Sequence, residues 1–172
     1  MMEQTLVLLK PDAVERGLIG RIIGRFETVG LKIIGMKMVW IDEKFALKHY
    51  TEDIAKRRGA HVREWLSTYI VEGPVIAIAI EGLHAIEAVR KIVGSTEPKS
   101  APAGTIRGDF ALHSYSFADK KKKAIRNLIH ASGDEKDAKY ELNLWFDKKE
   151  LHSYETVAEK HLWKWGEKYG NR

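Results

Sequence analysis

Two successive strand–helix–strand patterns limit how this chain can fold more than any other feature of its sequence. Each begins with an apolar run typical of a buried strand, continues with apolar residues at helical spacing, and ends in a further strand. The first pattern covers 5–9, 18–29 and 31–41, and the second covers 74–80, 84–93 and 127–130. This order predicts an α+β fold, the ferredoxin-like split βαβ sandwich, with an antiparallel sheet covered by helices on one face.

Cap and turn residues predict the remaining elements. Asp42 can cap a helix that runs through Tyr50, and a further helix is expected at 134–144. Residues 95–108 contain two prolines and two glycines, so we expect a long ordered loop there rather than a helix or strand. Long loops in compact domains are often functional.

The length and the ends of the chain bear on its organisation. With 172 residues and 44% hydrophobic content, we interpret 1–172 as a single domain in which 154–172 is a C-terminal extension. Trp163 and Trp165 are candidates to cover an interface or to pack this extension on its own subunit. The start does not resemble a secretory signal, and the apolar runs are far shorter than the roughly 20 residues that span a membrane. We therefore expect a cytoplasmic protein without a membrane partner.

The absence of cysteine leaves histidine as the leading candidate for covalent chemistry. There is no thiolate nucleophile, disulfide or cysteine-bound metal in this chain. Among seven histidines, His130 stands at a strand end and is followed by the small residues Ala131 and Ser132. Such a site has room for a phosphate, but the same spacing also fits an ordinary strand that ends in a polar turn.

A formal net charge of +5 favours anionic partners without distinguishing nucleotides from nucleic acids or acidic membranes. Phosphoryl transfer needs fixed cations, and Lys10, Arg90 and Arg107 are candidates at or near the predicted loop and strand ends. Neither the phosphate-loop motif nor the Gly-x-Gly-x-x-Gly fingerprint is present, which disfavours the two common nucleotide-binding classes.

The combined motifs resemble the nucleoside diphosphate kinase family over residues 5–154, and they occur in the order found in that family. They are Lys10-Pro11-Asp12, His49-Tyr50, Gly73-Pro74-Val75 with Glu81-Gly82, Gly94-Ser95-Thr96-Glu97-Pro98, residues 104–110, Asn127-x-x-His130-Ala131-Ser132, and residues 141–146. The resemblance implies transfer of the γ-phosphate of a nucleoside triphosphate, typically ATP, to a nucleoside diphosphate. It also implies a ping-pong mechanism through phosphohistidine at His130, with a broad base and sugar range.

The same resemblance implies a role for each matching residue. Nδ1 of His130 would attack, and Glu141 would bind the other ring nitrogen with help from Ser132. Lys10 and Asn127 match residues that bind sugar hydroxyls and nearby phosphate oxygens. The residues that match the phosphate-binding wall are Tyr50, Arg90, Thr96 and Arg107. Mg²⁺ would arrive on the nucleotide phosphates without a dedicated protein cage, and the chain would form a homo-oligomer built from dimers, a hexamer rather than a tetramer.

Three positions depart from the family pattern. Gly133 follows Ser132 where the family usually has an aspartate near hydrated magnesium. Val62 falls where a phenylalanine commonly stacks on the base, so Tyr69, Trp65 or an aromatic residue within 114–117 is an alternative stacking residue. Residues 111–126 contain an insertion with a run of four lysines.

Two other functions compete with the enzyme. The lysine run beside Tyr115 and Phe117 suggests a nucleic-acid-binding module, although such runs are usually solvated, so nucleic acid is not expected as the main partner. An inactive relative that serves only as an assembly subunit would be expected to lose the nucleophile or its phosphate ligands, and both are present here.

Overall fold

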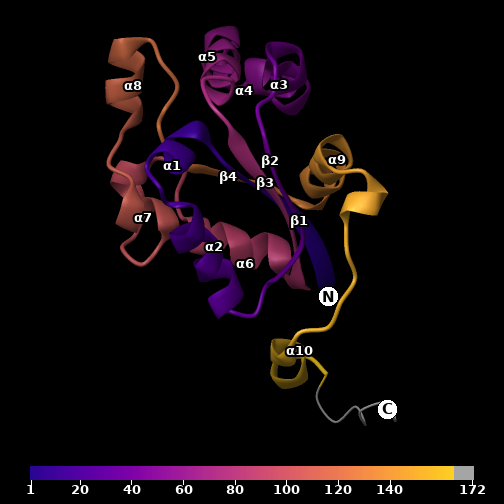
Figure 1. Cartoon of the computed structure of the whole chain (residues 1–172). Helices are drawn as coiled ribbons and strands as arrows, with labels where there is room; N and C mark the ends of the chain where they lie inside the picture. The colour runs from indigo at the N-terminus through magenta and orange to yellow at the C-terminus, as the bar shows by residue number, and fades with distance from the viewer. Residues whose placement is uncertain (165–172) are drawn as a thin grey trace.

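A four-stranded antiparallel sheet forms the centre of the molecule in the computed structural model, which describes residues 1–164 (Figure 1). The strands are β1 (Met2–Leu9), β2 (Lys32–Val39), β3 (Val75–Leu83) and β4 (Ile129–Ala131). Their order is β2-β3-β1-β4, so β1 lies between β3 and β4. The predicted α+β ferredoxin-like fold is confirmed.

Helices connect and flank these strands. They are α1 (Pro11–Glu15), α2 (Ile19–Thr28), α3 (Glu43–His49), α4 (Glu52–Arg58), α5 (Ala60–Ile70), α6 (Ala85–Val93), α7 (Ile106–Phe110), α8 (Tyr115–Lys121), α9 (Glu135–Trp145) and α10 (Val157–Leu162), with short 3₁₀ helices at Pro98–Ser100 and Lys148–Glu150. The helices predicted at 18–29, 42–50, 84–93 and 134–144 correspond to α2, α3, α6 and α9. Within residues 1–164, no helix is long and apolar enough to cross a membrane.

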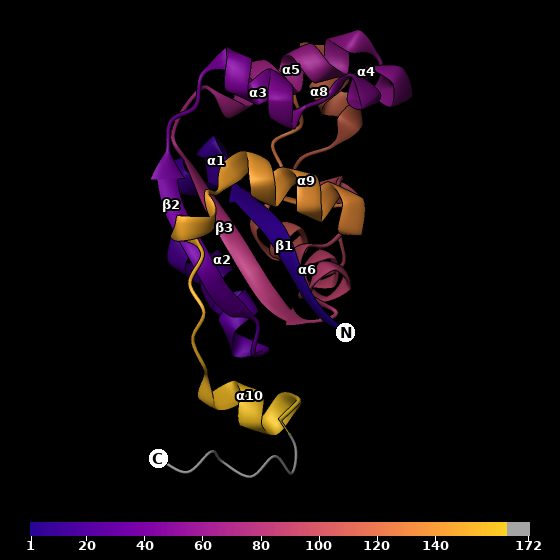
Figure 2. The ribbon, with the colours of Figure 1, turned by 90° about the vertical axis from the view of Figure 1, so that its right-hand side faces the viewer.

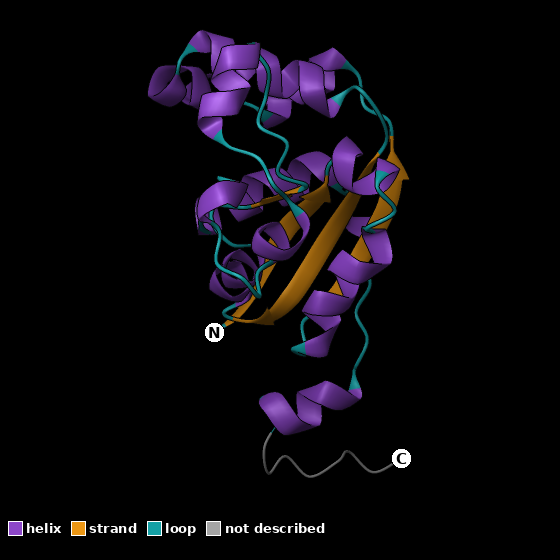
Figure 3. Cartoon of the chain, turned by 90° about the vertical axis from the view of Figure 1, so that its left-hand side faces the viewer, coloured by secondary structure: helices purple, strands orange, loops and turns teal. Residues whose placement is uncertain are grey.

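Helices cover both faces of the sheet, so the expectation of a single covered face is wrong. Val7 and Leu9 of β1 pack with α2 and α6, which lie in front of the sheet in Figure 3. Leu6 and Leu8 point to the other face, where α9 crosses in front of β1 in Figure 2. The reason is that successive β1 side chains are apolar on both faces, and each face must be buried against another layer.

Two local expectations also need correction, and some helices were not predicted. The segment 95–108 is partly helical, because Thr105 caps α7 by accepting a hydrogen bond from the Gly108 N–H at 3.1 Å. The last strand covers Ile129–Ala131 rather than 127–130, since Leu128 has a left-handed backbone with φ of 67° that cannot continue a strand. The helical pair α4 and α5, and α8 in the insertion, were not predicted.

Lys32 of β2 anchors the C-terminal extension. Its Nζ lies 2.8 Å from Glu81 of β3 and 3.1 Å from Glu159 of α10, and it donates to the Tyr154 carbonyl at 2.9 Å. Lys32 and Glu159 are both buried. Trp163 is half-buried in this extension, whereas Trp165 lies outside the described residues.

We expect Lys32→Met to lower the free energy of unfolding by about 3 kcal/mol, because it leaves the buried carboxylate of Glu159 with less compensation. The matched control on the same strand is Lys37→Met, whose partially exposed pair with Glu150 should contribute less than about 1 kcal/mol. Urea unfolding of both variants measures the difference. Equal losses would show that Lys32 is not a special anchor.

Candidate active site

A cleft of about 1300 Å³ opens where β1 ends and β4 begins. Its walls come from α3, α4, α5, α8 and α9 together with the loop that follows α6. Every residue predicted for the site lines this cleft: Lys10, Tyr50, Val62, Arg90, Thr96, Arg107, Asn127, His130 and Glu141. Elements far apart in the sequence are therefore brought together around one space.

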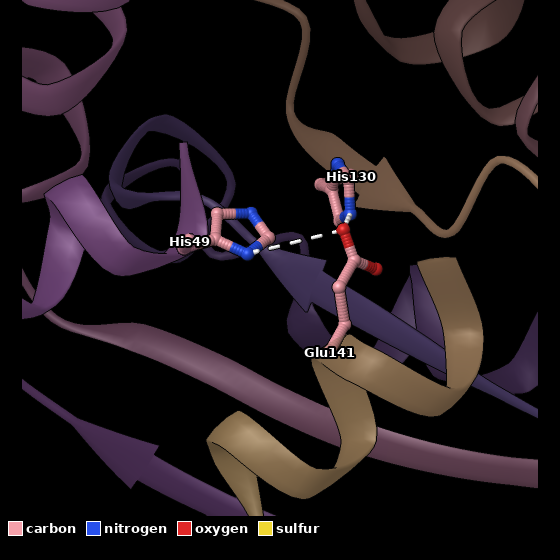
Figure 4. Close-up of side chains that lie close together, drawn as sticks. All are labelled: His49, His130 and Glu141. Atoms are coloured by element: carbon pink, nitrogen blue, oxygen red, sulfur yellow. Dashed lines mark hydrogen bonds and ion pairs between the residues drawn. The ribbon is translucent and has the colours of Figure 1, made fainter. Parts of the chain in front are cut away.

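His130 is held on one side by a carboxylate. Its Nε2 lies 2.8 Å from Oε1 of Glu141, and Ser132 Oγ donates to the other carboxylate oxygen at 2.6 Å. Burial would raise the pKa of Glu141, but the charge interaction and hydrogen bond with His130, together with His49 and the Ser132 hydrogen bond, hold that pKa below its usual range. An ionised Glu141 keeps the proton on Nε2 and leaves the lone pair on Nδ1. Figure 4 shows this second ring nitrogen on the side away from Glu141.

The backbone before His130 is fixed by the segment that follows β1. The Lys10 N–H donates to the Leu128 carbonyl at 2.8 Å, and the Leu128 N–H donates to the Asp12 carboxylate at 3.1 Å. These bonds maintain the left-handed φ of Leu128, a conformation that costs energy in a residue with a side chain. Asp12 and Leu128 thus turn the chain sharply between Asn127 and His130.

Lys10 and Asn127 link the segment after β1 to the long loop after α6. Its Nζ donates to Asn127 Oδ1 at 2.8 Å, and Asn127 Nδ2 donates to the Thr96 carbonyl at 2.8 Å. Burial, and then repulsion from Arg107, lowers the pKa of Lys10 to about 7. An anion that binds beside this amine favours its charged form.

Arg107 has a structural role that the sequence did not reveal. It is buried, and its guanidinium donates to the carbonyls of Gly94 at 2.9 Å, Asn127 at 3.2 Å and Ile129 at 2.6 Å. Burial lowers the pKa of Arg107 to about 10. Because a guanidinium has five N–H donors, Arg107 can join the loop to β4 and still offer donors to a phosphate.

The other predicted residues occupy different depths of the cleft. Arg90 at the end of α6 and Thr96 in the loop are exposed, and Val62 of α5 is half-buried. Tyr50 is buried, its hydroxyl finds no hydrogen-bond partner among the described residues, and burial raises its pKa. A hydrogen bond to a ligand in the cleft would satisfy this hydroxyl.

His49 belongs to the site although it was not singled out. Its buried ring meets that of His130 edge-on, with centroids 4.6 Å apart, and its Nδ1 accepts from Trp145 Nε1 at 3.3 Å. Burial, and then the charge of His130, lowers the pKa of His49 to about 3, so the ring is neutral. The only sequence signal was its place in the His49-Tyr50 motif.

The family model described as nucleoside diphosphate kinase matches residues 3–151. The chain belongs to the nucleoside diphosphate kinase family. It is 46% identical over 160 residues to the nucleoside diphosphate kinase of Borreliella burgdorferi, covering 92% of this chain and 96% of that one. The corresponding protein of Pyrococcus furiosus is 48% identical over 158 residues, covering 92% and 91%. As a member of this family, the chain is a phosphotransferase.

Solved structures show the same likeness. A transition-state mimic of the Borrelia burgdorferi nucleoside diphosphate kinase, with bound vanadate and ADP, superposes with a TM-score of 0.92 at 44% identity, covering 94% of this chain and 96% of that one. A halophilic nucleoside diphosphate kinase from Halobacterium salinarum in complex with CDP gives a TM-score of 0.79 at 38% identity, covering 92% and 97%.

We expect Arg107→Lys to lower kcat/KM by an amount that corresponds to about 1–3 kcal/mol of transition-state stabilisation. The free energy of unfolding should fall by a similar amount, because an ammonium cannot replace the forked bonds to three carbonyls. Arg90→Lys is the control, since Arg90 is exposed and its replacement should affect activity without loss of stability. Steady-state kinetics and urea unfolding measure the two effects. An Arg107→Lys protein as stable as the parent would contradict the structural role.

Proposed function

We propose that this kinase transfers the γ-phosphate of a nucleoside triphosphate, typically ATP, to a nucleoside diphosphate by a ping-pong reaction at His130. The observation that carries this proposal is the bond from His130 Nε2 to Glu141, which leaves Nδ1 free at the cleft. Nδ1 attacks the γ-phosphorus, the bond to the β–γ bridging oxygen breaks, and the diphosphate leaves. A second diphosphate then attacks the phosphohistidine and restores the imidazole.

Glu141 stabilises the positive charge that develops on the ring of His130 as the N–P bond forms. Its second oxygen already accepts the Ser132 hydroxyl, so the carboxylate cannot swing away during the reaction. The lining cations Arg90, Arg107 and Lys10 face the charge on the transferring oxygens, and the Tyr50 hydroxyl is a further donor. Positioning and fixed charge supply most of the catalysis in such a transfer.

We further propose that Lys10 and Asn127 hold mainly the 3′-hydroxyl of the sugar and a nearby phosphate oxygen. Their mutual bond at 2.8 Å presents an ammonium and an amide at one point of the cleft. A contact limited to the 3′-hydroxyl accepts both ribose and deoxyribose. An apolar base contact at Val62 reads no donor or acceptor pattern, which supports a broad base range.

Mg²⁺ would enter on the nucleotide phosphates, where it neutralises charge on their oxygens. Within residues 1–164, the one compact group of metal-ligand types is His49, His130 and Glu141, whose two imidazoles do not suit a cation that prefers oxygen. Asp137 is better suited to accept hydrogen bonds from water on Mg²⁺. It lines the cleft, and its Oδ2 would lie only 2.6 Å from a Cβ added at Gly133. Glycine at 133 thus leaves space for the Asp137 carboxylate.

The proposed assembly is a homo-oligomer built from dimers, a hexamer rather than a tetramer. Met36, Met38 and Trp40 alternate along the edge strand β2 and just beyond it, with 56%, 56% and 68% of their surface exposed. An apolar row on a sheet edge supports contact with a second copy. Light scattering by the intact protein distinguishes six chains from four.

The proposed location is the cytoplasm, which agrees with nucleotide substrates.

Incubation with labelled ATP and no acceptor is expected to place acid-labile, base-stable phosphate on the protein, because His130 is the nucleophile. His130→Asn should abolish both the labelling and the transfer to diphosphates. A variant that kept full labelling would show that another residue is the nucleophile. A wild-type protein that binds ADP without any labelling would favour a binding function.

Nucleotide binding is also expected to take up a proton. Burial and Arg107 lower the pKa of free Lys10 to about 7, and bound phosphate oxygens raise it again by favouring the ammonium. At about pH 8, ADP binding should therefore take up as much as about one proton per site, an uptake that disappears below about pH 6, where Lys10 is already charged. Calorimetry in buffers of different ionisation enthalpy measures it. If Lys10→Met retained the uptake, another group would be responsible.

A further inference from the structure

Apolar side chains from α5 and from the insertion line two walls of the cleft, alongside charged residues such as Arg58 and Lys123. Val62, Trp65 and Leu66 of α5 recur at i, i+3 and i+4, so they share one helix face and form one wall. A second wall comes from the insertion, with Ala118 in α8 and Ala124 and Ile125 after it. Two apolar walls beyond a cationic pocket suit a flat base whose phosphates lie inside.

Tyr115 belongs to the insertion and is fixed at the cleft from two directions. Its backbone N–H donates to the carboxylate of Glu97, in the loop after α6, at 2.9 Å. Its hydroxyl accepts from Arg58 Nη1 of α4 at 3.1 Å, and the Arg58 guanidinium lies 6.0 Å from the ring centroid. Figure 1 shows α8 at the same end of the molecule as α4 and α5. The half-buried Tyr115 ring therefore has a defined position on the cleft wall.

The other aromatic candidates are less available. Tyr69 is fully buried, lies beneath the Arg126 guanidinium at 4.1 Å, and is not among the cleft residues. Trp65 shares the Val62 wall and packs edge-on with His61, with centroids 4.9 Å apart. Phe117, two residues after Tyr115, is half-exposed and lies outside the cleft lining. Tyr115 is the aromatic residue that the insertion adds to the cleft.

We propose that Tyr115 contacts the nucleobase through its ring and is an affinity-determining residue of this enzyme, with Arg58 and Glu97 as the residues that position it. This proposal rests on the proposed function, because it needs a nucleotide whose phosphates face His130. The insertion then takes over the aromatic contact that Val62 cannot provide. Stacking on a ring is tolerant of base identity, so the contact strengthens binding of every nucleotide.

The contact predicts a particular split in the kinetic constants. Stacking contributes equally in the ground state and the transition state, so its loss raises KM and leaves kcat nearly unchanged. Loss of one base–aromatic contact is expected to weaken binding about tenfold. A residue that acted only on the phosphates would change kcat as well.

The test compares Tyr115→Ala, Tyr115→Phe and the control Phe117→Ala. All three retain the backbone N–H that binds Glu97, so the tie between the insertion and the loop is preserved. Calorimetry measures binding of ADP and of inorganic diphosphate, which has no base. We expect Tyr115→Ala to weaken ADP binding about tenfold without affecting diphosphate, and Phe117→Ala to stay within about twofold of the parent. Tyr115→Phe should weaken ADP binding less than Tyr115→Ala, because the ring remains while the bond from Arg58 is lost.

Three results would overturn the proposal. Equal weakening by Tyr115→Phe would assign the effect to the hydroxyl, and parallel weakening of diphosphate binding would assign it to the phosphates. An unchanged Tyr115→Ala together with a weakened Trp65→Ala would assign the base contact to α5. Failure of the proposed function is separable, because wild-type protein would then bind ADP without transferring phosphate.

Val62→Phe provides an independent check on the opposite wall. A phenyl ring there adds a second aromatic surface, so we expect a lower KM for several nucleotides with little change in kcat. An unchanged or higher KM would mean that Val62 does not face the base.

Discussion

The turn at Leu128 is the constraint on which the rest of the site depends. A left-handed backbone at a leucine is unfavourable, and here both of its peptide groups are bound by the segment that follows β1. This turn orients three side chains. Asn127 faces Lys10, Leu128 packs in the core, and His130 faces Glu141. The pairing of β1 with β4 is therefore both part of the fold and the means of aligning the nucleophile.

Two buried cations line the cleft. Lys10 and Arg107 are both nearly inaccessible to water, and burial lowers the pKa of each. The protein compensates Arg107 with three backbone carbonyls and Lys10 with one amide, which are neutral partners rather than carboxylates. The nearby carboxylate of Asp12 offsets their charge only in part, so these cations retain their attraction for an incoming anion.

The strands and the amphipathic helices followed from the sequence because their apolar residues repeat at the spacing of each element. The residues alone offered His130, Lys10, Arg90 and Arg107 only as candidates, and their assigned roles came from the family resemblance, since a lone His130 or Arg107 has no distinctive spacing. The pair α4 and α5 escaped prediction because Lys56, Arg57 and Arg58 followed by Gly59 interrupt the apolar pattern.

Features created by tertiary contacts were beyond the reach of sequence patterns. The left-handed Leu128 shortened the last strand, and nothing in its residue type indicates that conformation. His49 and Arg107 are buried by distant elements, so their lowered pKa values depend on neighbours far along the chain. The uninterrupted apolar residues of β1 do indicate that helices cover both faces of the sheet.

The anchoring of the C-terminal extension at Lys32 has a consequence for the order in which the chain is made. The cleft residues end with Glu141, whereas the extension reaches Lys32 through Tyr154 and Glu159. Lys32 already has Glu81 as a partner on the neighbouring strand, so β2 can pair with β3 before the extension exists. During synthesis, a chain released as far as α9 holds every residue of the catalytic cleft, and the extension then fastens onto a sheet that is already built.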